Sequence, residues 1–251
     1  MKITSNFDSG NIEVVSIDPK KNAIRLKIRK DTNSDFFQWF HFRLTGAVDQ
    51  RCKISIINAG KSSYPGGWKN YQACASYDRE EWFRVPTTFR NGILTIDFEP
   101  EHNSVYFAYF APYSYERHLD LIHETQLFDN VSMEVVGKTF EGRDIEMLRV
   151  GKPGKNKKII WVIARQHPGE SMAEWFIEGM LSRLLDEDDP VSRTLLKEAV
   201  FYVVPNMNID GSIAGNLRSS ASGANLNREW QRPTKKYSPE VFYVRNKMDE
   251  T

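Results

Sequence analysis

The fold of this chain is decided by Lys158–Ala164 (KIIWVIA) and the residues that follow it directly, Arg165–Glu170 (RQHPGE). The first segment is a short, largely β-branched run bounded by a turn, which predicts a fully buried strand. Apolar residues then recur with helical spacing and predict a helix over residues 172–185. His167 and Glu170 therefore lie where a strand leads into a helix, at the carboxyl edge of a sheet. Open α/β sheets place their sites at this edge.

The residue types of this turn are those of a metal site. An imidazole and a carboxylate three residues apart can both point at a single ion. A catalytic zinc site commonly has three protein ligands and leaves the fourth position to water. The alternative is that His167 is a solvated loop histidine and Glu170 an acid favoured by the helix dipole. H-x-x-E is a short pattern, so the pair alone does not separate these interpretations.

Composition narrows the class of protein. The 251 residues are enough for one large domain or two of ordinary size. Lys and Arg number 34 and Asp and Glu 33, so no basic field exists to recruit nucleic acid or an anionic membrane. No signal-like segment or membrane-spanning run is found, and two cysteines make no disulfide framework. We expect a cytoplasmic protein without nucleic-acid or membrane partners; the sequence leaves its oligomeric state open.

Residues 1–118 are expected to form a β-sandwich domain. Apolar and polar residues alternate over 24–29, 39–44, 51–56 and 94–99, with turn-rich pieces between them. Short alternating strands with Gly and Pro punctuation predict an antiparallel sandwich. Its many aromatic residues are interpreted as packing rather than as a ligand platform.

Residues 119–251 are expected to form a second domain of α/β type, with the change of pattern falling near 112–125. A helix is predicted over 113–128, and two strands over 133–150 joined by a Glu-Gly turn. Strands and helices then alternate. A last helix starts at Ser238 with Pro239 in its first turn. It reaches Thr251 without a capping residue, from which we expect that the sequence is cut rather than finished.

Three polar pieces follow the second buried strand: Asn208–Gly211 (NIDG), Leu217–Arg218, and an Asn227–Arg228 pair in a Gly-bearing loop. An enzyme that trims the last residue of a peptide must bind a terminal carboxylate, which arginine meets bidentately. It must also stabilise an oxyanion beside the metal, a role for a second arginine. Arginines on polar loops are usually plain surface residues, but this order after H-x-x-E favours function.

With these motifs the whole chain resembles the zinc metallocarboxypeptidases, specifically the cytosolic carboxypeptidase subfamily. Thr139–Arg143 resembles the strand-turn-strand entry to the catalytic domain, and Arg165–Glu170 the first zinc motif. The resemblance implies an amino-terminal antiparallel β-sandwich followed by an incomplete α/β/α carboxypeptidase domain with a mixed sheet. It also implies one Zn²⁺ ion, with the residue roles as follows: metal ligands His167 and Glu170, oxyanion-stabilising Arg218, and substrate-carboxylate-binding Asn227 and Arg228.

Two departures from the family pattern stand out. Ile209 occupies a position where the family usually has Pro. The family's third zinc ligand is a later histidine and its general base a still later glutamate, yet no histidine follows His167. We therefore expect that the third ligand and the base lie outside this sequence, and that a protein ending at Thr251 would bind zinc weakly and release no amino acids.

The predicted activity is zinc-dependent hydrolysis of the C-terminal peptide bond of peptides or protein tails. Two alternatives are kept. An N-acyl-amino-acid amidohydrolase resembling aspartoacylase would share H-x-x-E and a later Asn-Arg pair but would need no β-sandwich. A non-catalytic peptide-binding relative would keep the fold without the metal. A His and then a Glu encoded after Thr251 would favour the enzyme. The C-terminal residue removed is not set by the sequence.

Overall fold

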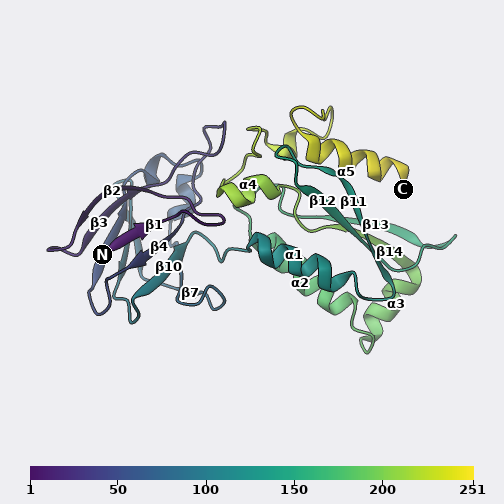
Figure 1. Ribbon diagram of the computed structural model, residues 1–251, viewed down its shortest axis with the longest axis horizontal. Coiled ribbons are helices and arrows are strands. Elements are labelled where there is room, and N and C mark those ends of the chain that lie inside the picture. Colours follow the sequence, from purple (N-terminus) through teal and green to yellow (C-terminus); the bar gives the residue numbers. More distant parts are fainter.

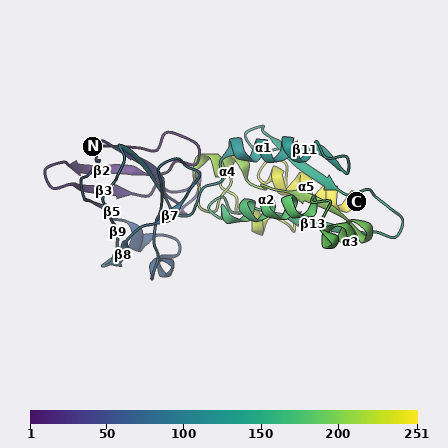
Figure 2. The ribbon, with the colours of Figure 1, turned by 90° about the horizontal axis from the view of Figure 1, so that it is seen from below.

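The computed structural model describes the whole chain, residues 1–251, as two parts. Figure 1 shows the amino-terminal part built of strands, and the carboxyl-terminal part as a sheet with helices on both sides. Seen from below, the two parts lie end to end (Figure 2). None of the helices combines the length and apolar character needed to cross a membrane.

The amino-terminal part consists of two five-stranded sheets, with the strand orders β1-β4-β10-β6-β7 and β2-β3-β5-β9-β8. All pairs are antiparallel except β3 with β5. The bounds of the elements, with two short 3₁₀ helices, are β1 Lys2–Thr4, β2 Glu13–Asp18, β3 Ala23–Lys27, β4 His41–Thr45, β5 Cys52–Ile56, η1 Ala59–Lys61, η2 Pro65–Trp68, β6 Cys74–Ser76, β7 Phe83–Arg84, β8 Thr87–Arg90, β9 Ile93–Phe98 and β10 Ser104–Ala108.

The alternation seen in the sequence explains how these sheets pack. Successive side chains of a strand point to opposite faces, so every second residue can enter one core. Ile24 and Leu26 of β3, and Ile54 and Ile56 of β5, are fully buried in a cluster of 21 residues between the sheets. The predicted sandwich is confirmed.

The carboxyl-terminal part has a mixed four-stranded sheet of order β11-β12-β14-β13. Only β13 and β14 are parallel. The bounds of its elements are α1 Tyr115–Thr125, β11 Val131–Lys138, β12 Asp144–Val150, β13 Lys158–Ile163, α2 Met172–Leu184, α3 Pro190–Glu198, β14 Ala199–Val204, α4 Ile209–Ala214, η3 Leu226–Arg228 and α5 Pro239–Glu250.

This sheet has an apolar core on each face. Along β12, Ile145 and Met147 pack with α5, whereas Leu148 and Val150 pack with α1 and α2. Figure 1 shows α5 across the sheet from α1 and α2. The arrangement confirms the predicted α/β/α layers. The division of the chain at residues 118 and 119 stays a prediction; α1 runs through this position.

The prediction that Lys158–Ala164 is a fully buried strand is wrong in its burial. β13 is an edge strand, its residues are half-buried or exposed, and 51% of Ile159 is exposed. Edge position is not readable from a short apolar run, because the run reports side-chain polarity and not which neighbours the strand pairs with.

The parallel pair brings two loops together. Because β13 and β14 run in the same direction, their carboxyl ends meet at one edge of the sheet. Ala164 N donates to Val204 O (3.0 Å), and Met207 N donates to Ala164 O (2.9 Å). The segments 165–170 and 205–210 therefore leave the sheet side by side.

Candidate metal centre

His167 and Glu170 meet in the turn that joins β13 to α2. Nδ1 of His167 lies 3.0 Å from Oε1 of Glu170. His167 is buried, whereas the Glu170 side chain is about half exposed. The hydrogen bond with His167 lowers the pKa of the Glu170 carboxyl, and the charge of Arg218 contributes to the shift. A nitrogen and an oxygen donor atom thus lie together at the carboxyl edge of the sheet.

The second ring nitrogen of His167 contacts Asn225, since Nε2 lies 3.2 Å from Asn225 Oδ1. An amide oxygen only accepts, so an Nε2–H group can donate to Asn225, and in the tautomer that does so Nδ1 presents a lone pair. That lone pair faces a carboxylate oxygen, and two acceptors 3.0 Å apart need a proton or a metal cation between them. The donor set fits a divalent cation, because histidine ligands usually donate their other N–H to an oxygen.

Asn225 was missed in the sequence, although it stands two residues before Asn227 in the segment already singled out. The available signal was that Asn225 and Asn227 are both polar and stand two positions apart. No group of three or more His, Cys, Asp or Glu side chains gathers anywhere as a metal site. His167 and Glu170 are therefore a pair, and the source of a third ligand stays a prediction.

A cavity of about 330 Å³ opens beside the pair. His167, Glu170 and Asn227 are among the polar residues that line it, and Ile163 and Phe176 are among the apolar ones. The structure thus brings Asn227, which lies 60 residues downstream of His167, to the candidate centre. A cavity with a few convergent polar groups and an apolar wall is the usual form of a site that binds a small molecule or the end of a peptide.

The two predicted arginines are placed differently. Arg218 Cζ lies 5.7 Å from the Phe36 ring and 5.8 Å from the Tyr64 ring, and its charge acts on Glu170. Arg228 is exposed, and its Nη1 donates to the carbonyl oxygen of Asn227 (3.0 Å). Neither arginine is among the residues that line the cavity, so their functional roles stay predictions.

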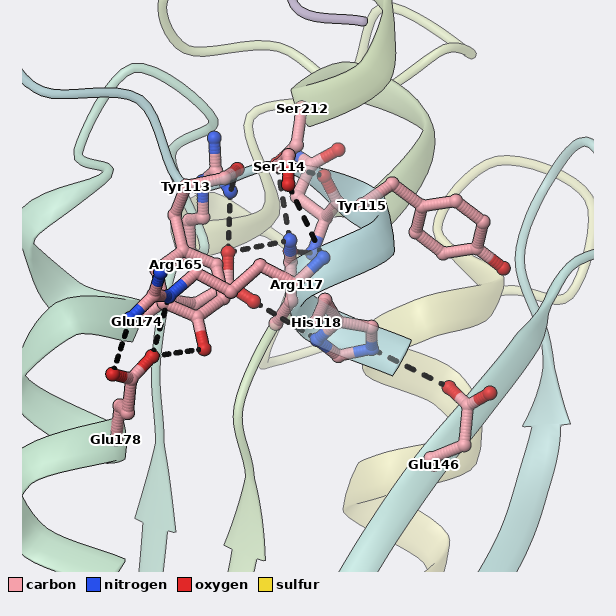
Figure 3. Close-up of polar contacts among 12 residues, drawn as sticks. Tyr113, Ser114, Tyr115, Arg117, His118, Glu146, Arg165, Glu174, Glu178 and Ser212 are labelled. Atoms are coloured by element: carbon pink, nitrogen blue, oxygen red, sulfur yellow. Dashed lines mark hydrogen bonds and ion pairs between the residues drawn. The ribbon is translucent and has the colours of Figure 1, made fainter. Parts of the chain in front are cut away.

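A buried charge network holds the turn from the inside, and Figure 3 shows its central members. Arg165 has a positive φ of 50° and is buried. Its Nε donates to Pro168 O (3.0 Å), its Nη1 donates to Tyr113 O (2.9 Å), and Nη1 also pairs with Glu174 of α2. The side chain of Arg165 thereby ties the backbone just after His167 to Tyr113 and to α2.

Glu174 is the centre of this network and is fully buried. Asn206 Nδ2 donates to its Oε2 (3.0 Å), and His118 Nδ1 lies 2.9 Å from its Oε1. On the other side of the ring, His118 Nε2 lies 3.7 Å from Glu146 Oε2. Burial alone would lower the pKa of His118, but Glu146 and Glu174 together raise it to about 9. Sequence reasoning missed the network; its signal was a glutamate in the buried stripe of α2 with Ile177, Leu181 and Leu184.

The Asn-Ile-Asp-Gly segment ties the neighbouring motifs together. Asn208 caps α4 by accepting from Gly211 N (3.2 Å), and its Nδ2 donates to Gln166 O (3.0 Å). Buried Asp210 pairs with Arg143 (2.6 Å) and accepts from Glu141 N (2.8 Å). The strand-turn-strand segment 139–143 and the turn 165–170, which carries His167 and Glu170, are thus joined through α4.

Comparison with known families agrees with this architecture. Residues 3–110 match the family described as cytosolic carboxypeptidase N-terminal domain, and residues 116–246 match the zinc carboxypeptidase family. The chain belongs to the zinc carboxypeptidase family. Within it, the amino-terminal part groups the chain with the cytosolic carboxypeptidases.

Individual relatives are similar over the whole chain. An uncharacterized protein of Zymomonas mobilis is 52% identical over 100% of this chain and 65% of its own length. A metallo-carboxypeptidase from Burkholderia cenocepacia is 52% identical with a TM-score of 0.97, covering 99% of this chain and 67% of its own. One from Pseudomonas aeruginosa is 47% identical with a TM-score of 0.96, covering 100% and 67%. The chain thus spans about two thirds of these relatives.

Proposed function

We propose that the protein is a zinc-dependent metallocarboxypeptidase that hydrolyses the C-terminal peptide bond of peptides or protein tails. The observation that carries the proposal is the pair of donor atoms, His167 Nδ1 and Glu170 Oε1, at 3.0 Å with Asn225 on the far side of the ring. Membership of the zinc carboxypeptidase family supports zinc as the metal. A bound zinc ion would supply a water of lowered pKa and a Lewis acid for the scissile carbonyl.

The chain's own residues would bind and orient the substrate. Asn227 lines the cavity, and exposed Arg228 follows it, so this pair is proposed to hold the terminal carboxylate. Arg218 is proposed to stabilise the developing oxyanion, since its charge already acts on Glu170. The Pseudomonas aeruginosa relative was solved with (2-guanidinoethylmercapto)succinic acid, a carboxylate-bearing compound, which supports a carboxylate subsite. A cytoplasmic location is proposed from the kinship with cytosolic carboxypeptidases.

Metal content tests the site separately from catalysis. In the protein expressed from its whole gene, His167→Ala should lose bound zinc, measured by atomic absorption after dialysis, because one ligand carries much of the binding free energy. His123→Ala is the matched control, since this histidine is exposed on α1. Zinc retained by His167→Ala at the level of the control would refute the assignment of this ligand.

Catalysis is tested on the protein expressed from its whole gene, by release of free amino acids from peptides with and without a chelator. Arg218→Ala should keep its zinc and lower kcat by roughly 10²–10³, the scale for one oxyanion donor. An Arg218→Ala protein that purified without zinc would contradict that role. Cleavage of N-acyl amino acids but not of peptides would favour the aspartoacylase-like alternative, and peptide binding without metal or turnover would favour the binding protein.

A further inference from the structure

The loop that carries Arg218 is bounded by glycines that touch the amino-terminal part of the chain. Gly215 has a φ of 73°, and a Cβ there would lie 2.6 Å from Ser9 O. Gly223 has a φ of 91°, and a Cβ there would lie 2.4 Å from Asn33 O. Neither position tolerates a side chain, because of both conformation and space. The segment between them, residues 215–223, is called the arginine loop below.

Hydrogen bonds from the first part span the whole arginine loop. They come from the segments before β2 and after β3, which are far from the loop in sequence but next to it at the junction near α4 (Figure 1). The contacts, outside those of Asp31, are Asn11 Nδ2 to Gly215 O (2.7 Å), Thr32 N and Oγ1 to Asn216 Oδ1 (3.0 and 3.2 Å) and Asn33 Nδ2 to Ala221 O (3.0 Å).

Asp31 makes the densest of these contacts. Its Oδ1 accepts from Leu217 N (2.7 Å), and its Oδ2 accepts from Arg218 N (2.7 Å) and Ser219 N (2.8 Å). Only 4% of Asp31 is exposed, and it forms no ion pair. Three successive N–H groups turned toward one carboxylate form an anion-binding concavity. The negative charge of Asp31 is therefore balanced by the backbone of the arginine loop and by no cationic side chain.

The same turn of the first part also reaches the arginine side chain. Asp31 N donates to Phe36 O (2.8 Å), which closes the turn 31–36. The Phe36 ring then lies 5.7 Å from Arg218 Cζ, with the Tyr64 ring at 5.8 Å from the same atom. Aromatic rings within about 6 Å attract a guanidinium through their quadrupole. The turn 31–36 thus binds the backbone of Arg218 through Asp31 and contacts its guanidinium through Phe36.

We propose that Asp31 is a positioning residue, which fixes the arginine loop and thereby orients the guanidinium of Arg218 for its proposed role beside His167 and Glu170. The amino-terminal domain is then a working part of the active site rather than an appendage. This inference rests on the proposed role of Arg218 in catalysis, while the hold of Asp31 on the loop is independent of that role.

Hydrogen exchange tests the hold of Asp31 on the loop directly. Asp31→Asn keeps the shape but loses the charge and sets an NH₂ group against an N–H donor. Exchange of the amides of residues 217–219, resolved by mass spectrometry with fragmentation, should quicken by about tenfold to a hundredfold, the scale for a bond to a charged acceptor. Asp35→Asn is the control, because Asp35 lies in the same turn with its side chain 93% exposed. Equal exchange in the two variants would overturn the proposal.

Kinetics separate positioning from plain structural support. In the protein from the whole gene, Asp31→Asn should lower kcat at least tenfold, with KM changed by less than about twofold and with zinc content unchanged. In an Arg218→Ala background it should lower kcat no further, since two residues acting through one group are not additive. Additive losses in the double variant would show a structural role and overturn the proposal.

Failure of the proposed function gives a different result. If Arg218→Ala alone leaves kcat unchanged, the catalytic role of the arginine is wrong. A rise of exchange confined to residues 217–219 would even then support the hold of Asp31 on the loop. Exchange that rises evenly through the chain would refute it, because it would report a general loss of stability.

Discussion

Stability should depend on pH through His118, whose ring lies between two buried carboxylates. The pKa of His118 is about 9 in the folded chain, against 6.5 for the free side chain. A group whose pKa is raised on folding contributes stability that is fully present below its unfolded pKa and is lost as the pH rises through its folded pKa. His118 should therefore stabilise the fold fully below pH 6.5 and progressively less up to and beyond pH 9.

The size of the effect follows from the two pKa values. At about 1.4 kcal/mol for each pKa unit, the difference corresponds to about 3 kcal/mol of unfolding free energy. The ring is buried, so solvent screens little of its interaction with the two carboxylates. The charged groups around the ring are Glu174, Glu146 and Arg165, which binds Glu174, and the Tyr115 ring stacks on it at 6.0 Å.

The assay is urea unfolding at a series of pH values between 6 and 10. Because other groups titrate in this range, the measured quantity is the difference in unfolding free energy between the wild-type chain and His118→Gln. That difference should fall by about 3 kcal/mol from pH 6 to pH 10. His123→Gln, which changes an exposed histidine on the same helix, should show no such slope. A flat difference for His118→Gln would refute a charged His118 in the network.

Three further variants test other parts of the second domain. Burial raises the pKa of Glu240 to about 7. Its ionisation therefore lowers the stability of the fold at pH values above 4.5, the pKa of the free side chain. Glu240→Gln should therefore be more stable than the wild-type chain at pH 8, by about 1–3 kcal/mol in urea unfolding, and the advantage should vanish near pH 4. Gly211→Ala would place a Cβ 2.5 Å from Asn208 Oδ1 and 2.7 Å from Ser219 O, so its Tm should fall clearly. Gly179→Ala, in α2 with open space around it, should gain about 0.5–1 kcal/mol, and equal behaviour of the two alanines would contradict the crowding at α4.

Local patterns in the sequence predicted much of the fold. Period-two alternation over 24–28 and 52–56 predicted strands whose apolar residues are buried in the sandwich core. The helix predicted from residue 172 begins at Met172, and the one predicted at Ser238 begins at Pro239. These features depend on side-chain spacing along a single element, which is a property of the sequence itself.

The candidate site was predictable only in part. His167 and Glu170 share one turn, so their proximity follows from three residues of sequence. Asn225 is 58 residues from His167, and nothing local indicates that it faces the second ring nitrogen. The edge position of β13 was likewise not predicted, since strand order is set by pairing between segments.

By itself, the sequence determined the strands with period-two alternation, the helices α1, α2 and α5, and the residue types of the turn 165–170, because backbone geometry converts spacing into faces. Only the tertiary structure decided that Asp31 holds residues 217–219, which lie 186 to 188 positions away. It also decided that His118, Glu146, Glu174 and Arg165 share one buried network. A buried charge is stable only beside its partners, and those partners come from distant elements that meet when both cores have formed.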